Sequence, residues 1–260
     1  MNQAVAKYTH FIGNLFNRTT VIIWTCALLL GILCVVMRSH VRNVSALYDA
    51  SYRLRIITRA LVEPIWNRSE FPQIACRDKD DNFTISWRAD IVNDFAPGKP
   101  ITYNKLHGVF SESNRELAQY RHRWFCDDSE RHSMKTSIFA IANGKSLFEI
   151  GNEWRSEKQI PSDAIVAVFL SFVTLDHWAQ PGDICIGSAR DDYCVTTFEA
   201  MDFPAGGIAV CVFWDEVTWV FYRKEDLQIA LQFADLYFAD EHNRDEVLKG
   251  IGRKIYSRAR

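Results

Sequence analysis

Several residue patterns that mark catalytic and metal sites are missing from this chain of 260 residues. No two of its seven cysteines have Cys-x-x-Cys spacing, and no histidine stands near them in a ligand pattern, which argues against a structural zinc site. There is no His-Glu-x-x-His frame, no Gly-x-Ser-x-Gly turn and no glycine-rich loop that opens a helix. The formal net charge of -2 gives no sign of nucleic-acid binding. The sequence therefore indicates no catalytic residue, no metal site, no cofactor and no nucleic-acid partner.

Charged side chains are also missing from one long stretch. No residue from Thr19 to Met37 is charged, and no Asp or Glu occurs anywhere between Met1 and Met37. An apolar helix of about 20 residues spans the hydrocarbon core of a bilayer, so residues 19–37 predict a transmembrane helix. The alternative is a cleaved signal peptide. The run is longer than a typical signal core, and Arg38, His40 and Arg42 follow it instead of a small-residue cleavage site, which favours a retained anchor.

The orientation of this anchor is less clear from charge. More arginines follow the span than precede it, and a count of flanking cations would place the C-terminal part in the cytosol. The cysteines bear on the same question. Cys185 and Cys194 are close in sequence, so they can form a disulfide if the soluble domain lies outside the cytosol. Two free thiols are the alternative, since the five cysteines after the span are an odd number.

The apolar pattern continues as a helix beyond the span. Leu47, Leu54, Leu61 and Ile65 share one face, which predicts a stalk helix that packs on a folded domain and ends near Pro64. Further on, β-branched and aromatic runs predict strands at 83–88, 136–141, 164–173, 208–213 and 216–222.

Capping residues and turns complete this outline. We expect a surface helix over 113–123 capped by Ser113, a tight hairpin at 213–217, and a helix over 227–238 capped by Asp226. The predicted fold class is α+β, with the stalk helix packed on a mainly antiparallel sheet. The predicted organisation is a cytosolic segment (1–18), the span (19–37), a soluble domain (38–240) and a charged, solvated tail (241–260).

Several polar clusters could in principle form binding or catalytic sites, but their patterns favour structural or surface roles. Asp78, Asp80 and Asn82 have the first spacing of a calcium loop, but Phe83 stands where glycine is needed and Ala89 where glutamate is needed, so a charged turn is the better interpretation. Scattered histidines, an acidic run and a glycine pair are likewise typical of surface, core and turn positions. These residues are His107, His122, His132, His177, His242, Asp127, Asp128, Glu130, Gly206 and Gly207.

Read in order, several segments resemble the pseudopilin-like proteins of planctomycete bacteria (domain of unknown function 1559), which are similar to the G-type pilins of type II secretion. The matching segments run from the stalk to the final hairpin. They are Tyr52–Leu61, Arg68–Pro72, Ser86–Arg88 (Ser-Trp-Arg), Ser113–Leu117, Trp124–Asp128, Thr136–Ile141, Trp178–Ile184 (Trp-x-x-Pro-x-Asp), Gly206–Val210 and Phe213–Val217.

The resemblance implies a pilin-like α+β fold, an extracytoplasmic domain, no enzymatic activity, and the lipid bilayer and other envelope or pilin-like proteins as partners. It favours a cytosolic N-terminus against the arginine count. Three departures are clear. The Asp-Gly-Ser of the family hairpin is replaced by Asp215-Glu216, and the family's Cys-Pro-Ser-Asp is replaced by Cys126-Asp127-Asp128. The Gly-Phe-Thr-Leu-x-Glu processing motif at the start of the span is absent.

Three functions are therefore considered. The first is a pilin-like structural or interaction protein in the inner membrane, and the second is a membrane-tethered sensor or ligand-binding module. The third is an enzyme of unrecognised type. A pocket lined by polar groups would favour the second, and a cleft with a strongly shifted carboxylate or histidine would favour the third.

Overall fold

A computed structural model describes the chain except for residues 1, 66–70, 81, 96–99, 127–132, 150, 152–153, 155–158, 187–193 and 257–260. For residues 2–20, 39–40, 42–43, 62–65, 94 and 256 it describes the backbone alone. The chain divides into two units, Met1–Leu47 and Tyr48–Arg260, and helix α1 (Asn2–Ile65) contributes to both.

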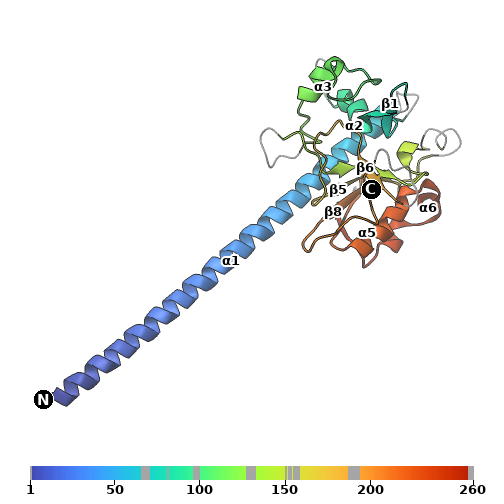
Figure 1. The fold of residues 1–260 in the computed structure, drawn as a ribbon. Coiled ribbons are helices and arrows are strands. Elements are labelled where there is room, and N and C mark those ends of the chain that lie inside the picture. Colours follow the sequence, from blue (N-terminus) through green and yellow to red (C-terminus); the bar gives the residue numbers. More distant parts are fainter. Residues whose placement is uncertain are drawn as a thin grey trace. The chain divides into compact units, whose positions relative to one another are not determined.

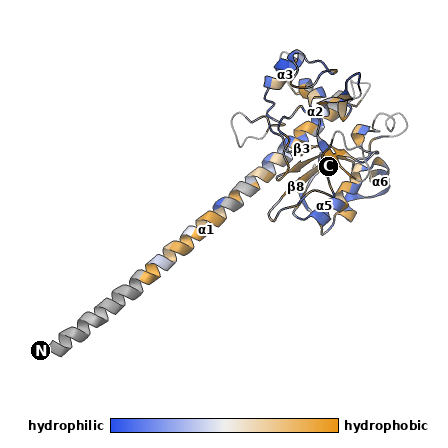
Figure 2. Ribbon diagram, in the orientation of Figure 1, coloured by the Kyte–Doolittle hydropathy of each residue, from blue (hydrophilic) through white to orange (hydrophobic). Residues whose placement is uncertain are grey.

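The first unit consists of α1 alone. Among the described residues, Val21–Arg38 is the one helical segment long and apolar enough to cross a membrane, and none of it is buried. Figure 2 shows this segment as a nearly continuous apolar band. The position agrees with the span predicted at 19–37.

In the second unit, α1 contributes a buried face. Leu54, Ile57 and Leu61 are each at most 2% exposed. Ser51 shares a 2.8 Å hydrogen bond with Thr218 of the central sheet, which places this face against the sheet. The predicted stalk face is therefore confirmed for Leu54 and Leu61, and Leu47 is also buried. The side chain of Ile65 lies outside the described residues, and the helix ends there, directly after Pro64.

The largest sheet has five strands, and every neighbouring pair in it is antiparallel. In spatial order they are β10 (Arg253–Tyr256), β9 (Thr218–Phe221), β8 (Ala209–Phe213), β5 (Ile165–Leu170) and β3 (Ile138–Phe139). All residues of β8 and β9 are buried, and such nearly unbroken apolar strands are typical of a sheet covered on both faces. The mainly antiparallel α+β architecture is confirmed at this level.

Two smaller sheets complete the unit. β4 (Ile141–Ala142), β6 (Asp183–Cys185) and β7 (Cys194–Thr197) form a parallel sheet, and β1 (Ala75–Arg77) pairs with β2 (Phe83–Ser86) in an antiparallel hairpin. The strand predicted at 136–141 is thus divided, because the chain leaves the five-stranded sheet after Phe139 and enters the parallel sheet at Ile141. Ala140 lies at this crossing.

The predicted strand 83–88 is too long. It stops at Ser86, and Trp87 starts the short helix α2 (Trp87–Asp90), followed by the 3-10 turn η1 (Val92–Asp94). Within this short helix Trp87 and Arg88 are both fully buried.

The helix predicted over 113–123 is shorter in the structure, and the predicted capping role of Ser113 is wrong. The 3-10 turn η2 (Glu112–Asn114) leads into α3 (Arg115–Gln119). The hydroxyl of Ser113 bonds His107 Nδ1 and Ser111 instead of the helix end. Figure 1 shows α2, α3 and β1 grouped at one end of this unit, with α5 and α6 at the other.

The C-terminal helices differ from the prediction in two ways. Helix α5 (Lys224–Ala230) begins before Asp226, whose carboxylate binds Arg223 and caps nothing. The 3-10 turn η4 (Leu231–Ala234) then separates it from α6 (Leu236–Glu241), since Asp235 accepts hydrogen bonds from two backbone amides and caps a new helix.

The segment from residue 241, which we expected to be a charged, solvated tail, is folded over much of its length, although many of its side chains are exposed. Residues 244–256 form α7 (Arg244–Val247) and then β10, which is the edge strand that pairs with β9. Arg244 is 4% exposed and its guanidinium binds Asp215 at 2.8 and 2.9 Å. Charge content suggested a tail, but Arg244, Asp245 and Lys254 form ion pairs within the fold.

Candidate functional site

The segments Ser86–Arg88 and Trp178–Ile184 meet at a buried ion pair. Arg88, from Ser-Trp-Arg, has a fully buried side chain and lies 2.9 Å from Asp183, the aspartate of Trp-x-x-Pro-x-Asp. A guanidinium has five N–H donors, and all five are used here. They donate to the carbonyls of Trp178, Ile138, Gln180 and Gly182 and to Asp183 Oδ1.

Asp183 connects three parts of the fold. Its Oδ1 accepts hydrogen bonds from Trp87 Nε1 (3.1 Å), Arg88 (2.9 Å) and the backbone N–H of Ala140 (2.7 Å). Its Oδ2 is buried with no hydrogen-bond partner in the described part of the chain. Burial raises the pKa of Asp183 above its ordinary value, while the Arg88 charge opposes that shift. The pair holds α2 and β6 at the point where the chain passes between the sheets.

An aromatic layer covers this centre. The rings of Phe125 and Trp178 are stacked at 5.7 Å, and His122 lies 5.2 Å from Phe125 and 5.7 Å from Trp178. Burial lowers the pKa of His122 to about 4, and the Arg123 charge adds to the effect. Its Nδ1 has no hydrogen-bond partner among the described residues. The imidazole is therefore neutral at pH 7 and packs as an aromatic ring.

Asp183 and His122, whose pKa values are shifted, are buried in the interior and do not face a described cleft. Arg88 and Asp183 are at most 1% exposed, and neither they nor His122 line the described clefts at Gln180 and Gln232. Burial raises the pKa of the Cys76 thiol to about 11 and that of Cys211 still further, so reactive thiolates are disfavoured. Within the described ranges, no three His, Cys, Asp or Glu side chains gather as metal ligands.

The hairpin between β8 and β9 is tight, as predicted. Glu216 N–H donates to the carbonyl of Phe213 (2.9 Å), and Glu216 has a φ of 67°, a conformation in which glycine is usual. The Glu216 carboxylate receives a 2.8 Å hydrogen bond from Arg59 of α1 and lies 3.8 Å from Arg55. These contacts offset the strain, and they attach the hairpin to the stalk helix.

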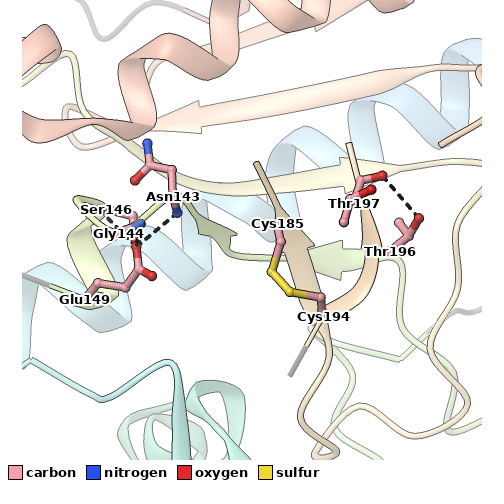
Figure 3. The surroundings of a disulfide bond; sticks show 8 residues. All are labelled: Asn143, Gly144, Ser146, Glu149, Cys185, Cys194, Thr196 and Thr197. Carbon is pink, nitrogen blue, oxygen red and sulfur yellow. Dashed lines mark hydrogen bonds between the residues drawn. A yellow bond between two sulfur atoms is a disulfide. The ribbon is translucent and has the colours of Figure 1, made fainter. Parts of the chain in front are cut away.

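Cys185 and Cys194 form a disulfide, with Cα atoms 5.8 Å apart (Figure 3). It joins the end of β6 to the start of β7. Parallel neighbours normally need a crossover of a dozen or more residues, and the connection here is shorter. Figure 3 also shows the Glu149 carboxylate beside the turn at 143–146, where Oε2 accepts hydrogen bonds from three backbone amides and the Ser146 hydroxyl.

In the described part of the chain, the polar clusters noted in the sequence do not come together in one site. Asp78 Oδ1 accepts from the N–H groups of Asp80 and Asn82, which confirms a turn. The Gly206-Gly207 pair forms a turn closed by a hydrogen bond from Gly207 N–H to Pro204. His177 is buried and bonded to backbone, and His107 and His242 are exposed. Residues 127, 128, 130 and 132 lie outside the described residues.

Comparison with known proteins does not add a relationship. No protein-family model, no curated protein and no solved structure matches this chain.

Sequence reasoning missed the Arg88–Asp183 pair itself. The two motifs that contain these residues were noted, but nothing in a separation of 95 residues predicts that they meet. The available signal was that each motif contains both a tryptophan and a charged residue.

Proposed function

We propose that this chain is a non-enzymatic, single-pass protein of the inner membrane whose pilin-like domain has a structural or interaction role in the cell envelope. The observation that carries the proposal is helix α1. Its segment Val21–Arg38 is apolar and unburied, and the same helix later provides the buried face of Leu54, Ile57 and Leu61. A helix that serves both as anchor and as core element is the architecture that the pilin-like resemblance implies.

The polar interior supports a structural role. The buried ionisable groups Arg88, Asp183 and Arg244 are engaged with partners inside the fold, and they do not line a described cleft. Catalytic groups with shifted pKa values normally face a cleft where a substrate can reach them.

The disulfide supports an extracytoplasmic domain. Disulfides persist in oxidising compartments and are rare in the cytosol. The Cys185–Cys194 bond therefore favours a cytosolic N-terminus, although more arginines follow the span than precede it. Long domains are translocated despite flanking charge.

The anchor also differs from a pilin that assembles after cleavage. In pilin assembly, as the resemblance implies, a peptidase cuts after a glycine, and a glutamate at the fifth mature position pairs with the new ammonium group of a neighbour. A cut after Gly13 in this chain would make Asn14 the first residue and Arg18 the fifth, so a cation would face that ammonium group. An unpartnered charge in the bilayer costs a few kcal/mol or more, and no Asp or Glu before Met37 offers a partner. We infer that the N-terminus is retained and that any assembly uses the soluble domains.

Protease protection in spheroplasts tests the proposal, with intact-mass measurement on the membrane-extracted protein. We expect the chain in the membrane fraction, an N-terminal tag protected from external protease, a digested C-terminal domain, and a mass that includes the N-terminal residues. By length and composition alone, a signal sequence near the N-terminus can resemble this span. A soluble product that begins after the span would therefore refute the anchor, and a mass beginning at Asn14 together with filaments would refute retention.

A further inference from the structure

An exposed aromatic ring stands on the loop before α3. Phe110 is 67% exposed, more than any other large apolar side chain described in the second unit, and Leu106 on the same loop is 47% exposed. Single exposed apolar residues are ordinary on protein surfaces, so this exposure alone assigns nothing.

Hydrogen bonds with the buried side chain of Asn114 fix the loop that carries Phe110. Asn114 is fully buried, and its Oδ1 accepts a 2.6 Å hydrogen bond from the N–H of Asn104. Its Nδ2 donates to the carbonyls of Asn104, His107 and Gly108 at 2.8 to 3.1 Å. The Phe110 ring also packs edge-on against the neutral ring of His177 at 5.4 Å. A loop fixed in this way loses little conformational entropy when a ligand binds.

A cleft of about 550 Å³ lies beside this loop. Its size is within the range of small-molecule sites. Its walls combine uncharged polar side chains with two phenyl rings, and none of the described lining residues is ionisable. The guanidinium of Arg77 lies 3.9 Å from the centroid of the Phe83 ring, but Arg77 does not itself line the cleft. The residues that define it are Asn82, Thr84, Ser111 and Gln180, with Phe83 and Phe110.

We propose that this cleft binds a segment of an uncharged oligosaccharide. Amide and hydroxyl groups both donate and accept hydrogen bonds, as sugar hydroxyls do, and an exposed ring offers an apolar face for the C–H groups of a sugar. Phosphates, nucleotides and free amino acids carry charges that need charged or strongly hydrogen-bonding partners, and none of the described lining residues is charged. The inference goes beyond the proposed anchoring role and does not depend on it, because it uses no residue of α1.

The test is titration calorimetry of the full chain in a zwitterionic detergent, since a maltoside headgroup would itself compete. The probes are the tetrasaccharides of N-acetylglucosamine and of glucose, and an uncharged tetrapeptide. We expect a Kd of about 1 mM or tighter for at least one tetrasaccharide. Phe110→Ala should weaken binding by about 3- to 10-fold, and Gln180→Ala should weaken it as well.

Tyr222→Ala is the matched control, because Tyr222 is another exposed aromatic residue (50%) and does not line the cleft. It should leave the Kd unchanged. Circular dichroism establishes that each variant is folded, and Gln180→Ala carries the test if Phe110→Ala does not fold. No binding of either sugar up to about ten times the expected Kd, or equal binding by the Phe110 and Tyr222 variants, would overturn the site. Binding of the peptide alone would overturn the ligand class.

Discussion

The buried Arg88–Asp183 pair offers the sharpest test of how this domain is held together. Asp183→Asn keeps the shape of the side chain and an oxygen that can accept from Trp87 and Ala140, but it removes the only carboxylate that contacts Arg88 in the described structure. The guanidinium then remains buried with carbonyl partners alone. Removal of one partner from a buried ion pair typically costs about 3 to 5 kcal/mol, a large part of the 5 to 15 kcal/mol that stabilises an average domain.

Urea unfolding of the full chain in detergent, followed by tryptophan fluorescence, measures this cost, because Trp87 and Trp178 lie next to the pair. Glu112→Gln is the matched control. It makes the same carboxylate-to-amide change in the exposed Glu112–Arg115 pair, whose side chains are 86% and 69% exposed. Such a surface pair contributes at most about 1 kcal/mol.

A loss of less than about 1 kcal/mol in Asp183→Asn would refute the reasoning, since it would mean that the arginine charge needs no buried counter-charge. If the single variant does not accumulate, Arg88→Met combined with Asp183→Leu gives the answer. Replacement of both charges by apolar side chains leaves no uncompensated charge, so the double variant should be more stable than Asp183→Asn. An equally unstable double variant would show that the hydrogen bonds of Arg88 matter more than its charge.

Three further outcomes are expected. Leu61→Ala should lower the free energy of unfolding by about 2 to 5 kcal/mol in the same assay, because Leu61 is 2% exposed. The control Leu106→Ala, at a leucine that is 47% exposed, should lower it by well under about 1 kcal/mol. Similar losses in the two variants would show that the stalk face is not part of the core. Thiol labelling of denatured, unreduced protein should leave Cys185 and Cys194 unmodified, and full labelling of both would exclude the disulfide. Burial lowers the pKa of His122 from 6.5 to about 4, so the neutral imidazole stabilises the fold fully above pH 6.5, and this stabilisation is lost as the pH falls towards 4. His122→Phe should remove up to about 3 kcal/mol of the pH dependence of the unfolding free energy in this range. An unchanged pH profile would contradict the buried neutral ring.

Much of the outline of this protein follows from local pattern. A long uninterrupted apolar run predicts a helix in a membrane or in a protein core. The seven-residue spacing of Leu54 and Leu61, about two helical turns, places both on one face of its continuation. The β-branched cores of β5, β8 and β9 and the turn residues between them were likewise visible, because strand propensity and turn chemistry act over a few neighbouring residues. The predicted boundaries were less accurate at Ser86, after which the chain turns into the short helix α2, and at Asp235, which caps the new helix α6.

What only the tertiary structure decided are the contacts between residues far apart in the chain. The charged C-terminal segment has the composition of a solvated tail, yet it becomes the edge strand β10 because β9 presents unpaired backbone groups and Asp215 offers a partner for Arg244. Arg88 and Asp183 meet across 95 residues, and the loop carrying Phe110 becomes one wall of a cleft only when Gln180 folds against it. Periodicity reports which face of an element is apolar, whereas the partner of a charge depends on which distant segment the sheets bring beside it.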